Sequence, residues 1–208
     1  MEKKEKESRC VKQSILIILF VIAPLYAIAQ NSQSSHIQEV GINFNNLNSF
    51  GIRYKCGNDT TLLRFTLLSL NGSDNRVKPD SVGFNESSTG FGFNIGFERR
   101  RNITEKLGYY YGLDLLTSYS SSRSRGYGTD FFKNESWTVS GGLGVVLGLN
   151  FKISNNIYLA AEVLPSIRVA CGKEKNASNG IAPTRTTIID YSYGLSNSGA
   201  SLTLSYRF

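Results

Sequence analysis

Apolar and polar residues alternate along most of this chain after residue 37. The last eleven residues show the pattern most clearly: Ala200, Leu202, Leu204, Tyr206 and Phe208 share one parity, and small or polar residues and one arginine occupy the other. A period of two places successive side chains on opposite faces of an extended strand. The pattern therefore predicts β-strands that each separate an apolar environment from a polar one.

Eight segments with this alternation predict an all-β, antiparallel fold. They cover residues 38–45, 49–57, 60–71, 88–100, 106–120, 135–151, 156–171 and 194–208. The first connection is short, and after it short connections alternate with long ones. The long connections cover residues 72–87, 121–134 and 172–193. Such alternation is typical of transmembrane up-and-down β-barrels, and a soluble β-sandwich gives no reason for it. Ten strands are the alternative to eight, because residues 184–193 also have strand propensity.

The charged residues inside these segments support the barrel interpretation. Those that would lie at membrane depth all fall on the parity opposite to the apolar set: Glu39, Arg53, Lys55, Arg64, Glu98, Asp114, Glu162 and Arg207. If the apolar face meets lipid, four acids and four bases point into the lumen, where isolated charges are costly and must be paired. The interior of an eight-stranded barrel is only wide enough for side chains. We therefore expect a charge-filled lumen without a large pore.

The N-terminus carries the pattern of an export signal. Residues 1–14 are rich in charge, residues 15–28 are almost wholly apolar, and residues 27–29 supply the small residues that signal peptidase prefers. This predicts a signal peptide over residues 1–29, a periplasmic tail over residues 30–37 and a barrel domain over residues 38–208. A membrane anchor is the alternative interpretation, but the apolar run is short for a span.

The C-terminal segment resembles the closing strand of a bacterial outer-membrane β-barrel. The matching residues of its Gly-x-x-Leu-x-Leu-x-Tyr-x-Phe ending are Gly199, Leu202, Leu204, Tyr206 and Phe208. The whole chain after residue 29 is similar to small outer-membrane β-barrel proteins of Gram-negative bacteria, including the porin-like groups of the Bacteroidetes type. The resemblance implies a place in the outer membrane, contact with its lipid and lipopolysaccharide, and recognition of the ending by the barrel assembly machinery. It includes no catalytic motif.

The chain offers little for catalysis or metal binding. His36 is the only histidine, and in a periplasmic tail it cannot serve an active site in the outer leaflet. Cys56 and Cys171 are expected at opposite ends of the barrel, beyond disulfide reach and without the spacing of metal ligands. The acids of the long connections follow no calcium-binding pattern. We therefore predict no enzyme, no cofactor and no metal.

The net charge of +7 does not indicate nucleic-acid binding, because the basic residues are scattered and the chain is predicted to be exported. Basic loops facing lipopolysaccharide phosphates are the preferred interpretation. The candidate contacts are Arg123, Arg125, Lys173 and Lys175. The first functional hypothesis is a non-enzymatic barrel whose external loops bind lipopolysaccharide or an unidentified surface ligand, or support the envelope. The alternative is a narrow porin-like channel for small solutes, which would need a path of unpaired cations.

Overall fold

The computed structural model describes residues 36–46, 49–77, 83–127, 131–178, 181–195 and 199–208. The predicted signal peptide and residues 30–35 of the predicted tail lie outside these residues. The described part contains ten β-strands, and every pairing between them is antiparallel. Their bounds are β1 Ile37–Asn46, β2 Ser49–Gly57, β3 Thr61–Val77, β4 Gly83–Asn102, β5 Leu107–Tyr127, β6 Phe132–Lys152, β7 Ile157–Val163, β8 Ser166–Ser178, β9 Ile181–Gly194 and β10 Ala200–Arg207.

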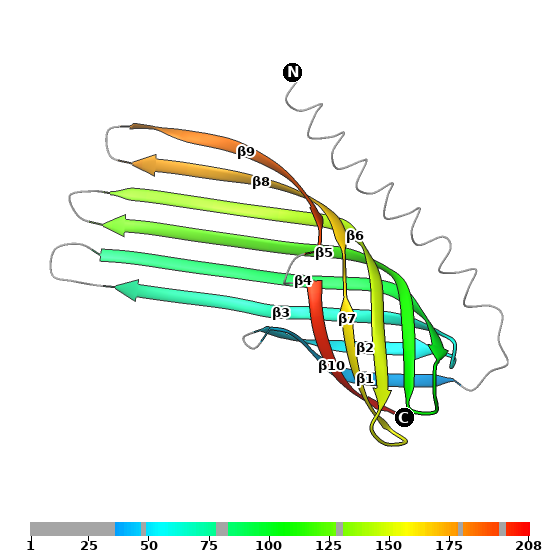
Figure 1. Cartoon of the computed structure of the whole chain (residues 1–208). Coiled ribbons are helices and arrows are strands. Elements are labelled where there is room, and N and C mark those ends of the chain that lie inside the picture. Colours follow the sequence, from blue (N-terminus) through cyan, green and yellow to red (C-terminus); the bar gives the residue numbers. More distant parts are fainter. Residues whose placement is uncertain (1–35, 47–48, 78–82, 128–130, 179–180, 196–198) are drawn as a thin grey trace. The chain divides into compact units, whose positions relative to one another are not determined.

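Eight of these strands pair in a closed cycle. Strands β1 to β7 follow one another in sequence order, β7 pairs with β10, and β10 pairs with β1. Each strand of the cycle therefore has two neighbours to accept and donate its backbone hydrogen bonds. Strands β8 and β9 lie outside the cycle and extend the sheet from the first half of β6 (Figure 1).

The count of ten arises because one predicted segment is divided and one further strand forms within a predicted loop. The segment predicted over residues 156–171 is interrupted at Leu164 and Pro165, where proline cannot donate a ladder hydrogen bond. Both halves still pair with β6 in one continuous register. Residues 184–193, on which the ten-strand alternative rested, lie within β9, and residues 195–199 separate β9 from β10.

The long loops predicted over residues 72–87, 121–134 and 172–193 are mostly strands, so this prediction is wrong. Strand β3 continues to Val77, and β5 continues to Tyr127. These segments carry mainly polar residues on both faces, so the apolar alternation disappears although backbone pairing continues. We call the parts of β3, β4, β5 and β6 beyond the cycle, together with β8 and β9, the extended sheet. In Figure 1 its strands run side by side, with β9 at one margin and β3 at the other.

The two ends of the cycle differ. We call the end with the connections at residues 57–61, 102–107 and 152–157 the short-turn end, and the opposite end the extended end. The C-terminal residue Phe208 also lies at the short-turn end, where its backbone N–H donates to the carbonyl of Gln38 over 3.0 Å.

The two faces of the cycle reverse the usual distribution of a water-soluble protein. Its interior buries charged residues such as Arg64 and Glu98, which are 1% and 0% exposed. Its outer face exposes large apolar residues on every strand, including Phe50 at 64%. These residues lie in register, as in the row that Ile42 forms with Ile52 and Leu204, so they form a continuous apolar belt. Within the part of the chain that the structure describes, no helix is long and apolar enough to cross a membrane.

Candidate functional site: a buried charge network

Charged side chains from seven strands converge inside the cycle. We call this cluster the charge network, and its members are Glu39 of β1, Arg53 and Lys55 of β2, Arg64 of β3, Glu98 and Arg100 of β4, Asp114 of β5, Glu162 of β7 and Arg207 of β10. Each lies on the parity opposite to the apolar belt, so strand alternation alone directs it inward. The geometry therefore brings together residues that are up to 168 positions apart in sequence.

Glu98 lies at the centre of one half of the network and accepts from three cations. Lys55 Nζ donates to both carboxylate oxygens over 3.0 and 2.9 Å. Arg64 Nη1 lies 3.1 Å from Oε2, and Arg100 Nε lies 2.7 Å from Oε1. Such charge-assisted hydrogen bonds are stronger than neutral ones, and they satisfy a carboxylate that water does not reach.

Glu162 organises the other half. Arg53 Nη2 donates to its Oε1 over 2.6 Å, and Arg64 Nη2 donates to both oxygens over 3.0 Å. The Tyr110 hydroxyl donates to Oε2 over 3.0 Å, and the Ser201 hydroxyl donates to Oε1 over 3.2 Å. Because Arg64 bonds to both Glu98 and Glu162, it joins the two halves.

A third carboxylate ties the network to the short-turn end. Glu39 receives a bidentate pair from Arg100, with distances of 2.6 and 2.7 Å. Arg207 donates to Glu39 Oε1 over 3.0 and 2.8 Å, and its Nη1 lies 3.6 Å from the exposed Asp59. Bidentate arginine–carboxylate geometry fixes orientation as well as charge.

Asp114 contacts the network less directly. Its Oδ1 lies 3.2 Å from Arg64 Nε, which is an ion-pair distance, although the two atoms lack hydrogen-bond geometry.

Neutral hydroxyl groups also take part in the network, since Arg53 donates to the hydroxyls of Thr66 and Thr203, each over 3.0 Å. The guanidinium groups are therefore each held by several partners, as are the carboxylates other than that of Asp114.

Two leucines lie next to the charge network on the side of the extended end. Leu116 follows Asp114 along β5, and Leu164 follows Glu162 beyond β7. Their side chains approach each other over Gly144, where an added Cβ would lie 2.9 Å from Leu164 Cδ1 and 3.3 Å from Leu116 Cδ1. A larger residue at position 144 would therefore require the leucine side chains to shift.

The structure places all eight sequence-predicted lumen residues inside the cycle, with Arg207 the least buried at 22% side-chain exposure. The sequence interpretation missed Arg100, which gives the network five cations to four acids instead of equal numbers. Arg100 shares parity with Glu98, so alternation could have identified it. Its place in the run of three arginines at residues 99–101, beside a turn, makes it resemble a solvated surface cation.

The four predicted lipopolysaccharide contacts lie on strands rather than loops. Register places them on the same side of the sheet as the apolar belt but beyond it, together with two further cations. We call this set the outer basic face: Arg123, Arg125, Lys133, Lys173, Lys175 and Arg185. Its central acid is Glu135, which lies 3.0 Å from Arg123 and 2.9 Å from Lys133. The hydrogen bond from Lys133 holds the pKa of Glu135 below its usual range.

The remaining sequence-predicted residues lie apart from the network. Leu202, Leu204, Tyr206 and Phe208 of the terminal motif point outward and are exposed, whereas Gly199 precedes β10 close to the carbonyl oxygen of Leu164. His36 is exposed before β1.

Cys56 lies in β2 and Cys171 in β8, and no disulfide joins the two. Among the described residues, no group of three or more His, Cys, Asp or Glu side chains is arranged to hold a metal ion.

No protein-family model and no curated protein matches this chain. Solved structures that resemble its fold include a major outer membrane protein from Thermus thermophilus, with 10% identity, a TM-score of 0.46, and coverage of 84% of this chain and 100% of that one. Acinetobacter baumannii CarO2 gives 10% identity, a TM-score of 0.42, and coverage of 86% and 100%. Neisserial surface protein A gives 16% identity, a TM-score of 0.31, and coverage of 83% and 92%.

Proposed function

We propose that this protein is a non-enzymatic β-barrel that spans the outer membrane of a Gram-negative bacterium, with an interior closed by the charge network. The observation that carries the proposal is the reversed distribution of polarity, with charges inside a closed cycle of strands and an apolar belt outside. A belt of this extent is unsuited to water but matches the hydrocarbon core of a bilayer. A closed cycle also leaves no unpaired strand edge in lipid. The signal-peptide pattern at residues 1–29 supports export.

Membrane integration is tested with the mature chain, residues 30–208, refolded in the presence of phosphatidylglycerol liposomes. We expect the protein to float with the liposomes on a density gradient and to remain with them after washing in alkaline carbonate. The charge-introducing variants Ile42→Arg and Leu204→Arg should reduce insertion, because arginine on the lipid face costs about 2–4 kcal/mol at the bilayer midplane. Protein that stays soluble without liposomes contradicts the proposal.

The interior favours a plugged barrel over the alternative of a narrow channel. A cationic path would need Arg53, Lys55 and Arg64 to be unpaired, whereas each bonds to a buried carboxylate. The leucines over Gly144 add an apolar closure. We expect the refolded protein to be silent in planar-bilayer conductance measurements. Discrete, reproducible conductance steps would instead support the channel, and Arg53 and Arg64 would then be the residues to substitute.

The outer basic face supports contact with lipopolysaccharide. It presents six cations next to the apolar belt and on the same side of the sheet, with Glu135 among them and Asp74 farther along the same row. Trp137 lies opposite Lys173 in the register, where the belt meets the basic residues. Amphipathic aromatic residues are typical of the border between hydrocarbon and polar headgroups. Lipopolysaccharide phosphates would lie at this level.

This contact is tested by neutralising Arg123, Arg125, Lys173 and Lys175 with glutamine. We expect lipopolysaccharide binding to weaken and to lose much of its salt dependence, because phosphate contacts are electrostatic. The matched control neutralises four cations near the short-turn end: Arg99, Arg101, Lys106 and Lys152. Equal loss in both variants would show a general charge effect, and unchanged binding in the first variant would refute the assignment.

A further inference from the structure

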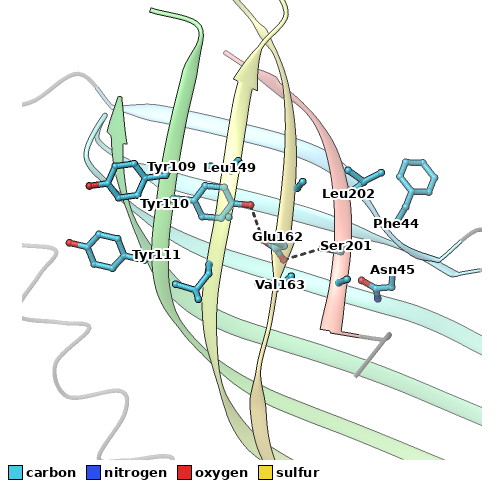
Figure 2. A pocket seen from close by; sticks show the side chains of 14 residues that line it. Phe44, Asn45, Tyr109, Tyr110, Tyr111, Leu149, Glu162, Val163, Ser201 and Leu202 are labelled. Carbon is cyan, nitrogen blue, oxygen red and sulfur yellow. Dashed lines mark hydrogen bonds between the residues drawn. The ribbon is translucent and has the colours of Figure 1, made fainter. Parts of the chain in front are cut away.

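A groove with a volume of about 1130 Å³ crosses the outer wall of the cycle, over β1, β5, β6, β7 and β10. In Figure 2, Tyr109 and Tyr111 project from β5 at one side, and Phe44 projects from β1 at the other. Between them the wall carries the small side chains of Ala161 and Ala200. Large rings therefore flank a floor of methyl groups.

Register explains the shape of the groove. One row of paired residues crosses the wall from β1 to β5 and consists of Phe44, Leu202, Ala161, Leu149 and Tyr109. Residues opposite each other in an antiparallel sheet share a face. This row therefore has aromatic rings at both ends and a single methyl group at its centre. In the neighbouring row, Ala200 takes the small position and Tyr111 the aromatic end.

The groove lies next to the charge network, since Glu162 belongs to both. Tyr110 also lines the groove, and its hydroxyl donates to Glu162, but both of these side chains are buried (Figure 2). The outward side chains along the floor are aliphatic, so an occupant must be apolar along its length. The exposed tyrosines of the groove are Tyr109 and Tyr111, whose rings stack with centroids 6.5 Å apart.

We propose that this groove binds one acyl chain of a glycerophospholipid from the membrane leaflet at the short-turn end. The inference rests on the proposed membrane location. Strand β5 begins at Leu107, so Tyr109 lies at the short-turn end, where its hydroxyl can donate to an ester or phosphate oxygen. The acyl chain then passes over Ala161 toward Ala200 at the start of β10.

The source of affinity in this groove differs from that of a site in water. Moving an acyl chain from bilayer hydrocarbon to a protein groove gains no hydrophobic free energy, because lipid tails are as apolar as leucine. Binding must come from van der Waals contacts with the preformed rows and from the tyrosine hydroxyls. Filling the floor should therefore remove binding even though it adds apolar surface.

The test measures lipid retention by native mass spectrometry. The refolded protein is incubated with phosphatidylglycerol or with purified lipid A, and then transferred to a lipid-free detergent. The variants Ala161→Trp and Ala200→Trp fill the groove, and Tyr109→Phe removes one donor. The control Ile52→Trp adds an equal ring to the belt on β2, outside the groove. All variants are first checked for flotation with liposomes, which reports membrane integration separately.

We expect the wild type and Ile52→Trp to retain one phosphatidylglycerol molecule. The two groove-filling variants should retain about tenfold less, and Tyr109→Phe should retain about fivefold less because one hydrogen bond is lost. Retention of lipid A alone would overturn the assignment to the short-turn leaflet. A dimer that dissociates in Ala161→Trp would show that a second copy fills the groove. Equal retention in all proteins that float with liposomes would show unspecific lipid contact and refute the site.

Discussion

The charge network and the outer basic face both gather cations, but they neutralise them in opposite ways. Inside the cycle, Glu98 and Glu162 together bond to four cationic side chains, and water does not reach them. On the extended sheet, Glu135 is the central acid among six cations, and its side chain is 27% exposed. Arginine, lysine and glutamate therefore have different roles in the two clusters, and the role depends on whether the side chains are buried or exposed.

The difference follows from the cost of removing charge from water. A buried ion has no solvent to stabilise it, so every member of the network needs protein partners with good geometry. An exposed cation is already stabilised by water and remains available for an external anion. We infer that the network determines the stability of the cycle, whereas the outer basic face contributes little to stability and is suited to binding.

The largest expected effect comes from Glu98→Gln. The substitution keeps the shape of the side chain but leaves Lys55, Arg64 and Arg100 around a neutral amide. Breaking one partner of a buried ion pair costs about 3–5 kcal/mol. We expect the free energy of unfolding, measured by urea titration of the refolded protein in lipid vesicles, to fall by this amount. A loss below about 1 kcal/mol would show that water reaches the interior.

A double-mutant cycle on Glu39 and Arg100 sharpens the comparison. The single variants Glu39→Leu and Arg100→Met each leave a buried charge, whereas the double variant removes both charges. The double variant should therefore be more stable than the sum of the two losses predicts, with a coupling free energy of about 1–3 kcal/mol. The measurement is the same urea titration. Simple additivity would contradict the bidentate contact between the two side chains.

Strand alternation allowed much of this arrangement to be predicted from sequence. Within the cycle, one face meets interior polar groups and the other is apolar, so parity identified inward residues such as Arg64 and Glu162 without knowledge of their partners. Beyond the cycle both faces of the strands are polar, so the alternation of apolar and polar residues disappears. The alternation therefore predicts a loop over most of the residues that form β9. The groove depends on rows formed by five strands, and no local pattern encodes a row.

A smaller effect is expected for Tyr110→Phe. The hydroxyl donates to Glu162 over 3.0 Å, but this carboxylate also accepts from Arg53, Arg64 and Ser201. Removing one neutral donor from a satisfied group costs about 0.5–1.5 kcal/mol. We expect a modest shift of the urea midpoint with an unchanged slope. A loss as large as that of Glu98→Gln would mean that the hydroxyl positions the network instead of only completing it.

The smallest effect is expected at Glu135, whose carboxylate lies on the outer basic face. Its folded-state pKa is lowered by the hydrogen bond from Lys133, so ionisation stabilises the fold above the pKa of the unfolded chain. This contribution is lost as the pH falls through the lowered folded value. Exposed pairs contribute about 0.2–1 kcal/mol, so Glu135→Gln should lose no more than this at neutral pH.

In acid, where the wild-type carboxyl is protonated, Glu135→Gln and the wild type should be equally stable. Urea titrations at neutral and acidic pH, with and without high salt, check both statements. The same substitution removes the central acid of the outer basic face, so it should strengthen lipopolysaccharide binding while it slightly weakens the fold. Stronger binding together with lower stability would show that the outer basic face serves binding, in contrast to the charge network, which serves stability. A parallel loss of both would show that Glu135 orders the basic side chains around it.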